Sequence, residues 1–261
     1  MSHRPRKRFG QNFLSDPNII RRIVAAVAPA ATDTVLEIGP GRGALTGPLL
    51  ETGAEVHAVE IDRDLAALLR ETHGSEPRFT LHEGDALKLD LAGLAGAQPL
   101  RVVGNLPYNI STPLIFHLLE SAAEVTDLHL MLQREVVERM AAPPGDKTYG
   151  RLSVMCQYHA VVTPLFRVPP GAFHPRPKVD SMVVRLVPRR EPLLDAAAAS
   201  ALSVLVNQAF SRRRKTLRNA LDGLLDAARI EAAGIDPGLR PEVLALDDYL
   251  VLARSMVEEP R

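Results

Sequence analysis

The chain of 261 residues contains no tryptophan and only one cysteine, Cys156. A single cysteine excludes a framework of disulfides and a zinc site built from cysteines. Cys156 lies in an apolar stretch, so we expect an inert thiol in the core. The eight histidines are not spaced as metal ligands, and we expect no bound metal. Because aromatic residues make up only 4% of the chain, a tyrosine or phenylalanine in a polar loop is informative.

The sequence also lacks an apolar run long enough to span a bilayer. Its N-terminus is basic, but the apolar segment that a secretory signal peptide requires does not follow. We therefore expect a cytoplasmic, monomeric protein with no membrane segment. Hydrophobic residues make up 46% of the chain, which is enough for a real core, and the length allows one large domain with a smaller second one.

The formal net charge is zero, yet two segments are strongly basic. One lies at the N-terminus and the other in the last quarter of the chain. A solvated face or tail explains either cluster alone, but such clusters can also bind phosphates without reading bases. A proline-rich loop at 169–178 adds two further cations. The candidate phosphate-binding residues are Arg4, Arg6, Lys7, Arg8, Arg176, Lys178, Arg212, Arg213, Arg214, Lys215 and Arg218.

Four short apolar segments alternate with amphipathic ones in the first half of the chain. The strands are expected at 34–38, 56–59, 79–81 and 100–103. A β-α-β-α alternation predicts a parallel sheet with right-handed crossovers. The carboxyl ends of parallel strands lie at one edge, where open α/β sheets bind their ligands.

Residues that suit a ligand follow each of these strands. Gly39 and Gly41 belong to a glycine-rich turn before a helix, which lets a ligand approach the backbone closely. Glu60 ends the second strand and could accept hydrogen bonds from both hydroxyls of a ribose. Asp85 and Ala86 follow the third strand and suit an adenine amine. We therefore expect a cofactor that carries adenosine, and the glycine pattern leaves a dinucleotide and S-adenosylmethionine both open.

The fourth strand leads into the turn Asn105-Leu106-Pro107-Tyr108. A flat heterocycle could stack on Tyr108 while its exocyclic amine donates to the Asn105 side chain and the Leu106 carbonyl. Two such acceptors would hold an adenine N6 amine pyramidal and expose its lone pair. Taken alone, the turn is better explained by an ordinary β-to-α connection with Tyr108 in the core, but the ligand-type residues upstream change that balance.

The remaining segments predict two domains, at 1–188 and 189–261. Before the first helix, expected at 18–27, a segment with two phenylalanines could cover the core or close over a ligand. Further strands are expected at 125–132, 161–168 and 181–187, with a helix at 134–140. From residue 189 the composition shifts to alanine and leucine. Helices are expected there over 196–210, 212–226, 229–233, 241–244 and 247–257.

These motifs resemble those of the class I S-adenosylmethionine-dependent methyltransferases and, among them, the ribosomal RNA adenine N6-dimethyltransferases. The matching strings are RFGQNFL (8–14), LEIGPGRGALT (36–46), VEID (59–62), EGDAL (83–87), NLPYNIST (105–112), FHPRPKVDS (173–181) and AFSRRRKTLRNAL (209–221). They extend from residue 8 to residue 221, and the strings at 105–112 and 173–181 are highly specific. One departure is Arg212, where the family often carries glutamine.

The resemblance implies an α/β fold: a Rossmann-like class I methyltransferase sheet, mostly parallel with an antiparallel closing strand, and a small C-terminal all-helical domain. It implies S-adenosylmethionine as the cofactor. The residues that it implies for cofactor binding are Asn12, Leu14, Gly39, Gly41, Glu60, Asp85, Ala86 and Asn105. Two residues of the N-terminal arm, Asn12 and Leu14, would close over the cofactor.

For the target base, the resemblance implies that Asn105, Leu106 and Tyr108 hold one adenine and that Phe173 sandwiches its other face. A base taken out of its stack loses its neighbours, and two aromatic rings would replace them at roughly 1–3 kcal/mol each. The basic residues listed above would then contact RNA. The adenine amine is itself the nucleophile in a direct transfer of the methyl group, so no nucleophilic residue of the chain is needed.

Two branches of this family act on different RNAs. The housekeeping branch dimethylates two adjacent adenosines in a hairpin loop near the 3′ end of 16S rRNA, in the pre-30S small ribosomal subunit. RFGQNFL, Leu106 and the basic string favour it over the macrolide-resistance branch, which modifies large-subunit RNA. A non-catalytic ribosome-assembly factor is a further alternative. A dinucleotide-dependent oxidoreductase would explain Glu60 but neither the Asn105 turn nor Phe173.

Overall fold

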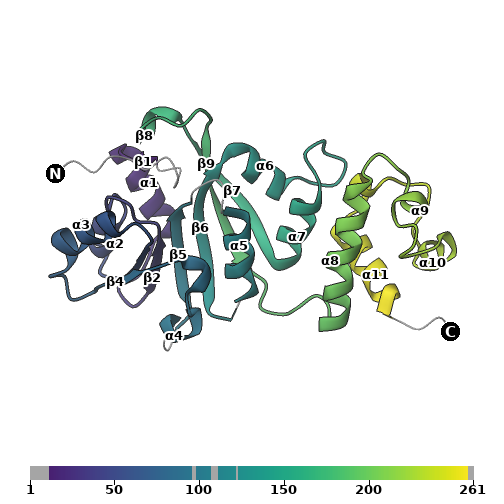
Figure 1. Cartoon of the computed structure of the whole chain (residues 1–261), viewed down its shortest axis with the longest axis horizontal. Coiled ribbons are helices and arrows are strands. Elements are labelled where there is room, and N and C mark those ends of the chain that lie inside the picture. The colour runs from purple at the N-terminus through teal and green to yellow at the C-terminus, as the bar shows by residue number, and fades with distance from the viewer. Residues whose placement is uncertain (1–11, 96–97, 107–110, 122, 258–261) are drawn as a thin grey trace. The chain divides into compact units, whose positions relative to one another are not determined.

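The computed structural model describes residues 12–95, 98–106, 111–121 and 123–257. The chain forms two compact units, and Figure 1 labels the helices and strands that they contain. The first unit comprises Met1–Val137 and Val162–Pro188, and the second comprises Glu138–Val161 and Arg189–Arg261. The segment Glu138–Val161 therefore packs with the C-terminal helices, although it precedes residue 188. A separate domain at 189–261 stays a prediction.

The first unit is built on a seven-stranded sheet with the order β4-β3-β2-β5-β6-β9-β7. These strands are β4 (Phe79–Glu83), β3 (Glu55–Glu60), β2 (Thr34–Ile38), β5 (Leu100–Asn105), β6 (Val125–Gln133), β9 (Ser181–Pro188) and β7 (Ala160–Val168). The strands from β4 to β6 pair in parallel, and β9 pairs with β6 antiparallel. The predicted α/β fold with an antiparallel closing strand is thus confirmed.

Helices precede, connect and follow the parallel strands. Their bounds are α1 (Pro17–Val27), α2 (Thr46–Leu50), α3 (Arg63–His73), α4 (Leu91–Ala95), α5 (Ser111–Glu120) and α6 (Arg134–Ala141). The carboxylate of Asp16 accepts from the Asn18 N–H at 2.8 Å and so caps α1. Asp62 caps α3 in the same way, accepting from the Asp64 N–H at 3.0 Å. An aspartate directly before a helical segment is a helix-start signal, so both caps follow from local sequence.

The strand order reverses at β2, because β3 lies on one side of it and β5 on the other. This arrangement places a crevice-forming switch point between the carboxyl ends of β2 and β5. Gly104 allows the two strands to approach, since a Cβ there would stand 2.8 Å from the Ile38 carbonyl oxygen. The site predicted at this sheet edge is therefore built where doubly wound sheets bind ligands.

A second, two-stranded sheet joins β1 (Phe13–Leu14) to β8 (Phe173–His174). The pairing is antiparallel and sets Phe13 opposite His174 and Leu14 opposite Phe173. Two short 3-10 helices, η2 (Ala86–Lys88) and η3 (Pro170–Ala172), complete the first unit. This small sheet ties the N-terminal arm to the proline-rich loop.

The second unit is largely helical, and one of its helices precedes residue 189. Its elements are α7 (Arg151–His159), α8 (Ala196–Ser211), α9 (Leu217–Ala220), α10 (Ala227–Ala232), η4 (Pro241–Val243) and α11 (Leu246–Val257). The buried hydroxyls of Tyr149 and Tyr249 donate to the carbonyls of Leu244 (2.9 Å) and Pro241 (2.6 Å). These bonds satisfy both hydroxyls inside the core.

The helix predicted over 212–226 is wrong. Residues 212–215 form a turn between α8 and α9, in which the Lys215 N–H donates to the Arg212 carbonyl. Arg213 leaves the helical path because its guanidinium pairs with Glu242 at 2.6 Å and donates to the Lys147 carbonyl. The basic residues 212–215 are thus carried by a turn, whereas Arg218 lies on α9.

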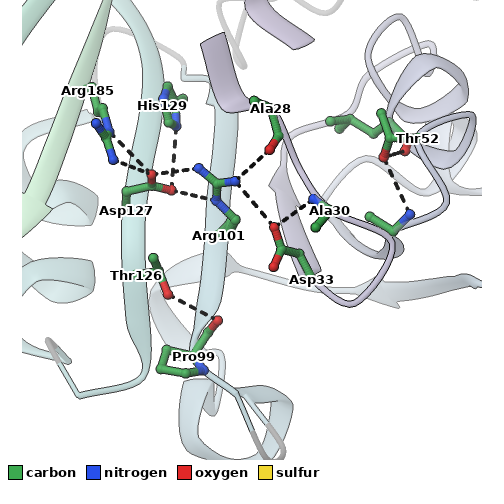
Figure 2. A network of polar contacts seen from close by, with 12 residues as sticks. Ala28, Ala30, Asp33, Thr52, Pro99, Arg101, Thr126, Asp127, His129 and Arg185 are labelled. Carbon is green, nitrogen blue, oxygen red and sulfur yellow. Dashed lines mark hydrogen bonds and ion pairs between the residues drawn. The ribbon is translucent and has the colours of Figure 1, made fainter. Parts of the chain in front are cut away.

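At the amino edge of the sheet, opposite the predicted site, a buried ion network joins three strands (Figure 2). Asp127 on β6 is fully buried and accepts two hydrogen bonds from Arg101 on β5, at 3.0 and 2.8 Å. Arg185 on β9 donates to the same carboxylate at 3.1 Å.

Across the described parts of the chain, no helix is both long and apolar enough to cross a membrane.

Candidate active site

The glycine-rich turn after β2 and the carboxylate at the end of β3 form one hydrogen-bonded unit. Glu60 is buried, and its two carboxylate oxygens accept from the Gly41 N–H at 3.1 Å and the Asp62 N–H at 2.9 Å. Burial raises the pKa of Glu60 above its ordinary value, and the two N–H donors oppose that rise. Each oxygen keeps a further lone pair, so the carboxylate can still accept from a diol.

Gly41 has to be a glycine for two reasons. Its φ of 62° lies in the left-handed region, and a Cβ there would stand only 3.1 Å from the Phe13 ring. Gly39, with a φ of 66°, donates its N–H to the Val59 carbonyl at 3.0 Å. Gly39 is thus exposed at the switch point, whereas Gly41 is buried against a phenylalanine of the N-terminal arm.

A second buried carboxylate, Glu37, lies near the end of β2. The Thr46 hydroxyl at the start of α2 donates to it at 2.6 Å. Burial raises the pKa of Glu37 to about 7, and the bond from Thr46 opposes the rise. This pair clamps the two ends of the glycine-rich turn.

Asp85 and Ala86 lie where the sequence predicts, directly after β4. The Asp85 carboxylate accepts from the Leu87 N–H at 3.1 Å and caps η2, and both residues are half-buried. One carboxylate oxygen is thus occupied by the backbone. A capping role alone would satisfy Asp85, so its contact with an adenine stays a prediction.

Asn105 ends β5, and its side-chain amide reaches the N-terminal arm. Its Nδ2 donates to the Asn12 carbonyl at 2.9 Å. The Leu106 N–H donates to the Met131 carbonyl at 3.2 Å, and the Leu106 side chain is buried. The backbone at Leu106 is therefore fixed to β6. Tyr108 lies outside the described residues.

The arm and Phe173 meet in the small sheet of β1 and β8. Leu14 is buried and pairs with Phe173, which is itself only 3% exposed and belongs to the core of the first unit. The ring is thus packed among apolar side chains in this structure. Stacking of Phe173 on a base requires the ring to become accessible, and that role stays a prediction.

The predicted cations divide into three groups. Arg176 and Lys178 are exposed in the loop after β8. Arg212, Arg214, Lys215 and Arg218 are exposed in the second unit, whereas Arg213 is engaged by Glu242. The N-terminal residues Arg4, Arg6, Lys7 and Arg8 lie outside the described residues. Among the residues that the structure describes, no three ligating side chains converge as a metal site would need.

A family model described as "Ribosomal RNA adenine dimethylase" matches residues 2–256. The chain belongs to the ribosomal RNA adenine dimethylase family. This membership confirms the resemblance and excludes a dinucleotide-dependent oxidoreductase. It also makes the chain a methyltransferase, in keeping with the order of its strands.

Individual relatives of this chain differ in how similar they are to it. The ribosomal RNA small subunit methyltransferase A of Aromatoleum aromaticum is 59% identical over 260 residues, covering 99% of this chain and 97% of the relative. A crystal structure of a dimethyladenosine transferase from Plasmodium falciparum is 28% identical, with a TM-score of 0.81, and covers 92% of this chain and 95% of that chain. The structure of the 23S rRNA methyltransferase ErmE is also 28% identical, with a TM-score of 0.75, and covers 95% and 100%.

Three further residues lie at the candidate site and were not predicted from the sequence. Ile61 follows Glu60 directly and is 53% exposed, so it presents an apolar face at the sheet edge. Phe13 packs on Gly41 and lies under the Arg42 guanidinium, 4.7 Å from the ring centre. Thr46 bonds Glu37. The only signal for Ile61 was an apolar residue directly after a strand-ending glutamate, and Phe13 was visible as part of the RFGQNFL string.

Proposed function

We propose that this protein dimethylates the N6 amines of two adjacent adenosines in the 3′ hairpin loop of 16S rRNA, within the pre-30S small subunit, using S-adenosylmethionine. The observation that carries the proposal is the 59% identity, over nearly the whole of both chains, to a small subunit methyltransferase. The 23S rRNA methyltransferase ErmE is only 28% identical. That difference favours the small-subunit substrate over the large-subunit one.

The residues at the sheet edge fit S-adenosylmethionine. Glu60 has lone pairs left for the ribose hydroxyls, Gly39 is exposed in the turn, and Ile61 offers an apolar face to the adenine ring. Asp85 and Ala86 lie beside it on the next strand end. When bound, the cofactor supplies an electrophilic methyl group on a positively charged sulfur.

The chain's own contribution is to position the target amine. The Asn105 side chain and the Leu106 carbonyl would accept hydrogen bonds from the amine N–H groups. Tyr108 and Phe173 would hold the base. The amine lone pair would then attack the methyl carbon in line while the carbon–sulfur bond breaks and its electron pair stays on sulfur, and the amine proton would pass to water afterwards. Catalysis of this kind depends on orientation and exclusion of water rather than on a covalent intermediate.

Affinity for RNA would come from exposed cations that contact phosphates. We assign this role in the second unit to Arg212, Arg214, Lys215 and Arg218, because Arg213 is already paired with Glu242. Arg176 and Lys178 would act close to the target base, with the N-terminal Arg4, Arg6, Lys7 and Arg8. Recognition of a folded loop would rest largely on shape.

The test is transfer of label from S-adenosylmethionine to unmodified small subunits, with large-subunit RNA alongside. Label in small-subunit RNA, recovered as N6,N6-dimethyladenosine, is the expected result. Label in large-subunit RNA would move the protein to the macrolide-resistance branch. Cofactor binding without transfer to either RNA would favour a non-catalytic assembly factor.

Tyr108→Ala gives a sharper version of this test. Loss of one stacking ring should lower turnover on small subunits by roughly ten- to a hundredfold, because base stacking contributes about 1–3 kcal/mol. Cofactor affinity, measured by calorimetry, should stay within a factor of two to three. A large loss of cofactor affinity with normal turnover would contradict the assignment of Tyr108.

A further inference from the structure

The side-chain amide of Asn105 is held in one orientation by the N-terminal arm. Its Nδ2 donates to the Asn12 backbone carbonyl at 2.9 Å, in a partly buried contact. A backbone carbonyl can only accept, so the NH2 group must be the part of the amide that faces Asn12. The Oδ1 atom consequently lies on the opposite side of the planar amide.

The Asn12 carbonyl is itself firmly anchored, because the next three residues are fixed on two sides. The Phe13 ring packs on Gly41, 3.1 Å from where a Cβ would stand, and the Arg42 guanidinium covers it. Leu14 is buried and pairs with Phe173. The Ser15 N–H donates to the Ala172 carbonyl at 2.8 Å.

Rotation of the Asn105 amide would therefore be costly. It would turn Oδ1 toward the Asn12 carbonyl, so that two acceptors face each other and a hydrogen bond is lost. An amide that could rotate freely would offer a purine either an acceptor or a donor. Because the Asn105 amide is held, its acceptor atom Oδ1 stays on the side that faces away from the arm.

We propose that the Asn12 carbonyl is a positioning group that makes Asn105 select a 6-amino purine over a 6-oxo purine. The inference rests on the proposed function, in which Asn105 receives the N6 amine. Adenine donates at position 6, whereas guanine and hypoxanthine present an oxygen acceptor there. An oxygen facing Oδ1 would leave two acceptors without a proton between them, and the arm prevents the rotation that would relieve this.

The direct test is NMR of the free, 15N-labelled protein. The Asn105 side-chain NH2 signals are assigned by their loss in Asn105→Ala, and their exchange with water is measured. Slow exchange is expected in the native protein. Phe13→Ala removes the packing on Gly41 and should speed this exchange about tenfold or more, a typical effect of losing one hydrogen bond. Phe13→Tyr keeps the ring and should preserve slow exchange.

The second measurement is binding to small subunits reconstituted with adenosine or inosine at the two target positions. The native protein and Phe13→Tyr should bind the adenosine form about tenfold more tightly. Phe13→Ala should reduce this ratio by several fold, and the Leu106 carbonyl, which can only accept, should keep the remaining preference. Fast exchange of the Asn105 amide in the native protein, or equal binding of both subunits, would overturn the inference. Methyl transfer to unmodified subunits would still support the proposed function in either case, so the two failures are distinguishable.

Discussion

Two buried carboxylates, Glu37 and Glu60, lie on neighbouring strands and differ in their hydrogen-bond donors. Glu60 accepts from two backbone N–H groups, one on each oxygen, which oppose the rise in its pKa that burial causes, and its remaining lone pairs can receive a diol. Glu37 accepts from the Thr46 hydroxyl on one oxygen and is fully enclosed. Burial therefore dominates at Glu37, which can take up a proton near neutral pH.

Glu37→Gln should change how stability depends on pH. Between the unfolded-state value of 4.5 and the folded value of about 7, the native state holds more protons than the unfolded state, so raising the pH lowers stability. The contribution of Glu37 is present below pH 4.5 and is lost by about pH 7. Relative to Glu37→Gln, the native protein should lose roughly 3 kcal/mol over this window, measured by urea unfolding.

The control for this experiment is Glu51→Gln, since Glu51 is exposed just after α2. Its unfolding free energy should follow that of the native protein at every pH. A constant difference between the native protein and Glu37→Gln from pH 4.5 to pH 7 would contradict the raised pKa of Glu37.

Glu60→Gln should weaken cofactor binding without unfolding the protein. An amide NH2 would face one of the two backbone N–H donors, and one acceptor for the ribose would be lost. The mismatch inside the protein lowers its stability, whereas the lost hydrogen bond from the ribose to a charged acceptor costs about 1.5–3 kcal/mol of binding free energy. Affinity for S-adenosylhomocysteine should therefore fall roughly ten- to a hundredfold in calorimetry. Glu55→Gln, exposed on the same strand, is the matched control. Unchanged affinity in Glu60→Gln would remove Glu60 from the site.

At the scale of elements, the two edges of the sheet are held by different forces. The carboxyl edge carries glycines, amides and carboxylates that meet at the switch point. The amino edge is locked by Asp127, which joins β5, β6 and β9 through Arg101 and Arg185 (Figure 2). Burial alone would raise the pKa of Asp127, but the donated bonds lower it below its ordinary value. Arg101 also reaches the Ala28 carbonyl at the end of α1, at 3.0 Å.

Asp127→Asn should destabilise the protein by about 1–3 kcal/mol, because Arg101 and Arg185 lose a charged acceptor, while Arg101 keeps its pair with Asp33 and the Arg185 side chain is 45% exposed. The measurement is denaturant unfolding at neutral pH. Thr126→Ala, an exposed position on the same strand, should change stability by no more than about 0.5 kcal/mol. Equal losses in the two variants would show that the ion network contributes nothing specific.

At the scale of the whole molecule, the positive charge that would serve RNA binding is spread over segments far apart in the sequence. The proline-rich loop belongs to the first unit and the turn after α8 to the second. A net charge of zero hides this distribution. Binding that relies on several such contacts should depend steeply on salt.

Arg214→Gln with Lys215→Gln should therefore flatten the salt dependence of binding to small subunits. Each lost phosphate contact should reduce the slope of log affinity against log salt by about one, so the double variant should lose about two. The comparison is Arg213→Gln, which should leave the slope unchanged and lower the melting temperature, because Arg213 pairs with Glu242. An equal loss of slope in Arg213→Gln would contradict this division of roles.

Local sequence was sufficient for most of the sheet and for the ends of several helices. β2 spans Thr34–Ile38 as predicted, and Asp16 and Asp62 cap α1 and α3 through bonds to N–H groups two residues further along the chain. Such features depend on apolar periodicity and on bonds within three residues, which a sequence displays directly. The order of ligand-type residues after successive strands likewise determined which edge would carry the site.

Contacts between distant residues were decided only by the tertiary structure. A turn at 212–215, in which Arg213 pairs with the distant Glu242, stands where the sequence predicted a helix. The helix α7 packs with the C-terminal helices, although a long stretch of chain separates them. Asn105 meets the Asn12 carbonyl, and Phe13 meets Gly41. Residue types and spacing thus determine the family, the sheet and the candidate residues. The orientation of an amide or the burial of a ring depends on partners far away in the chain, whose positions exist only once the chain has folded.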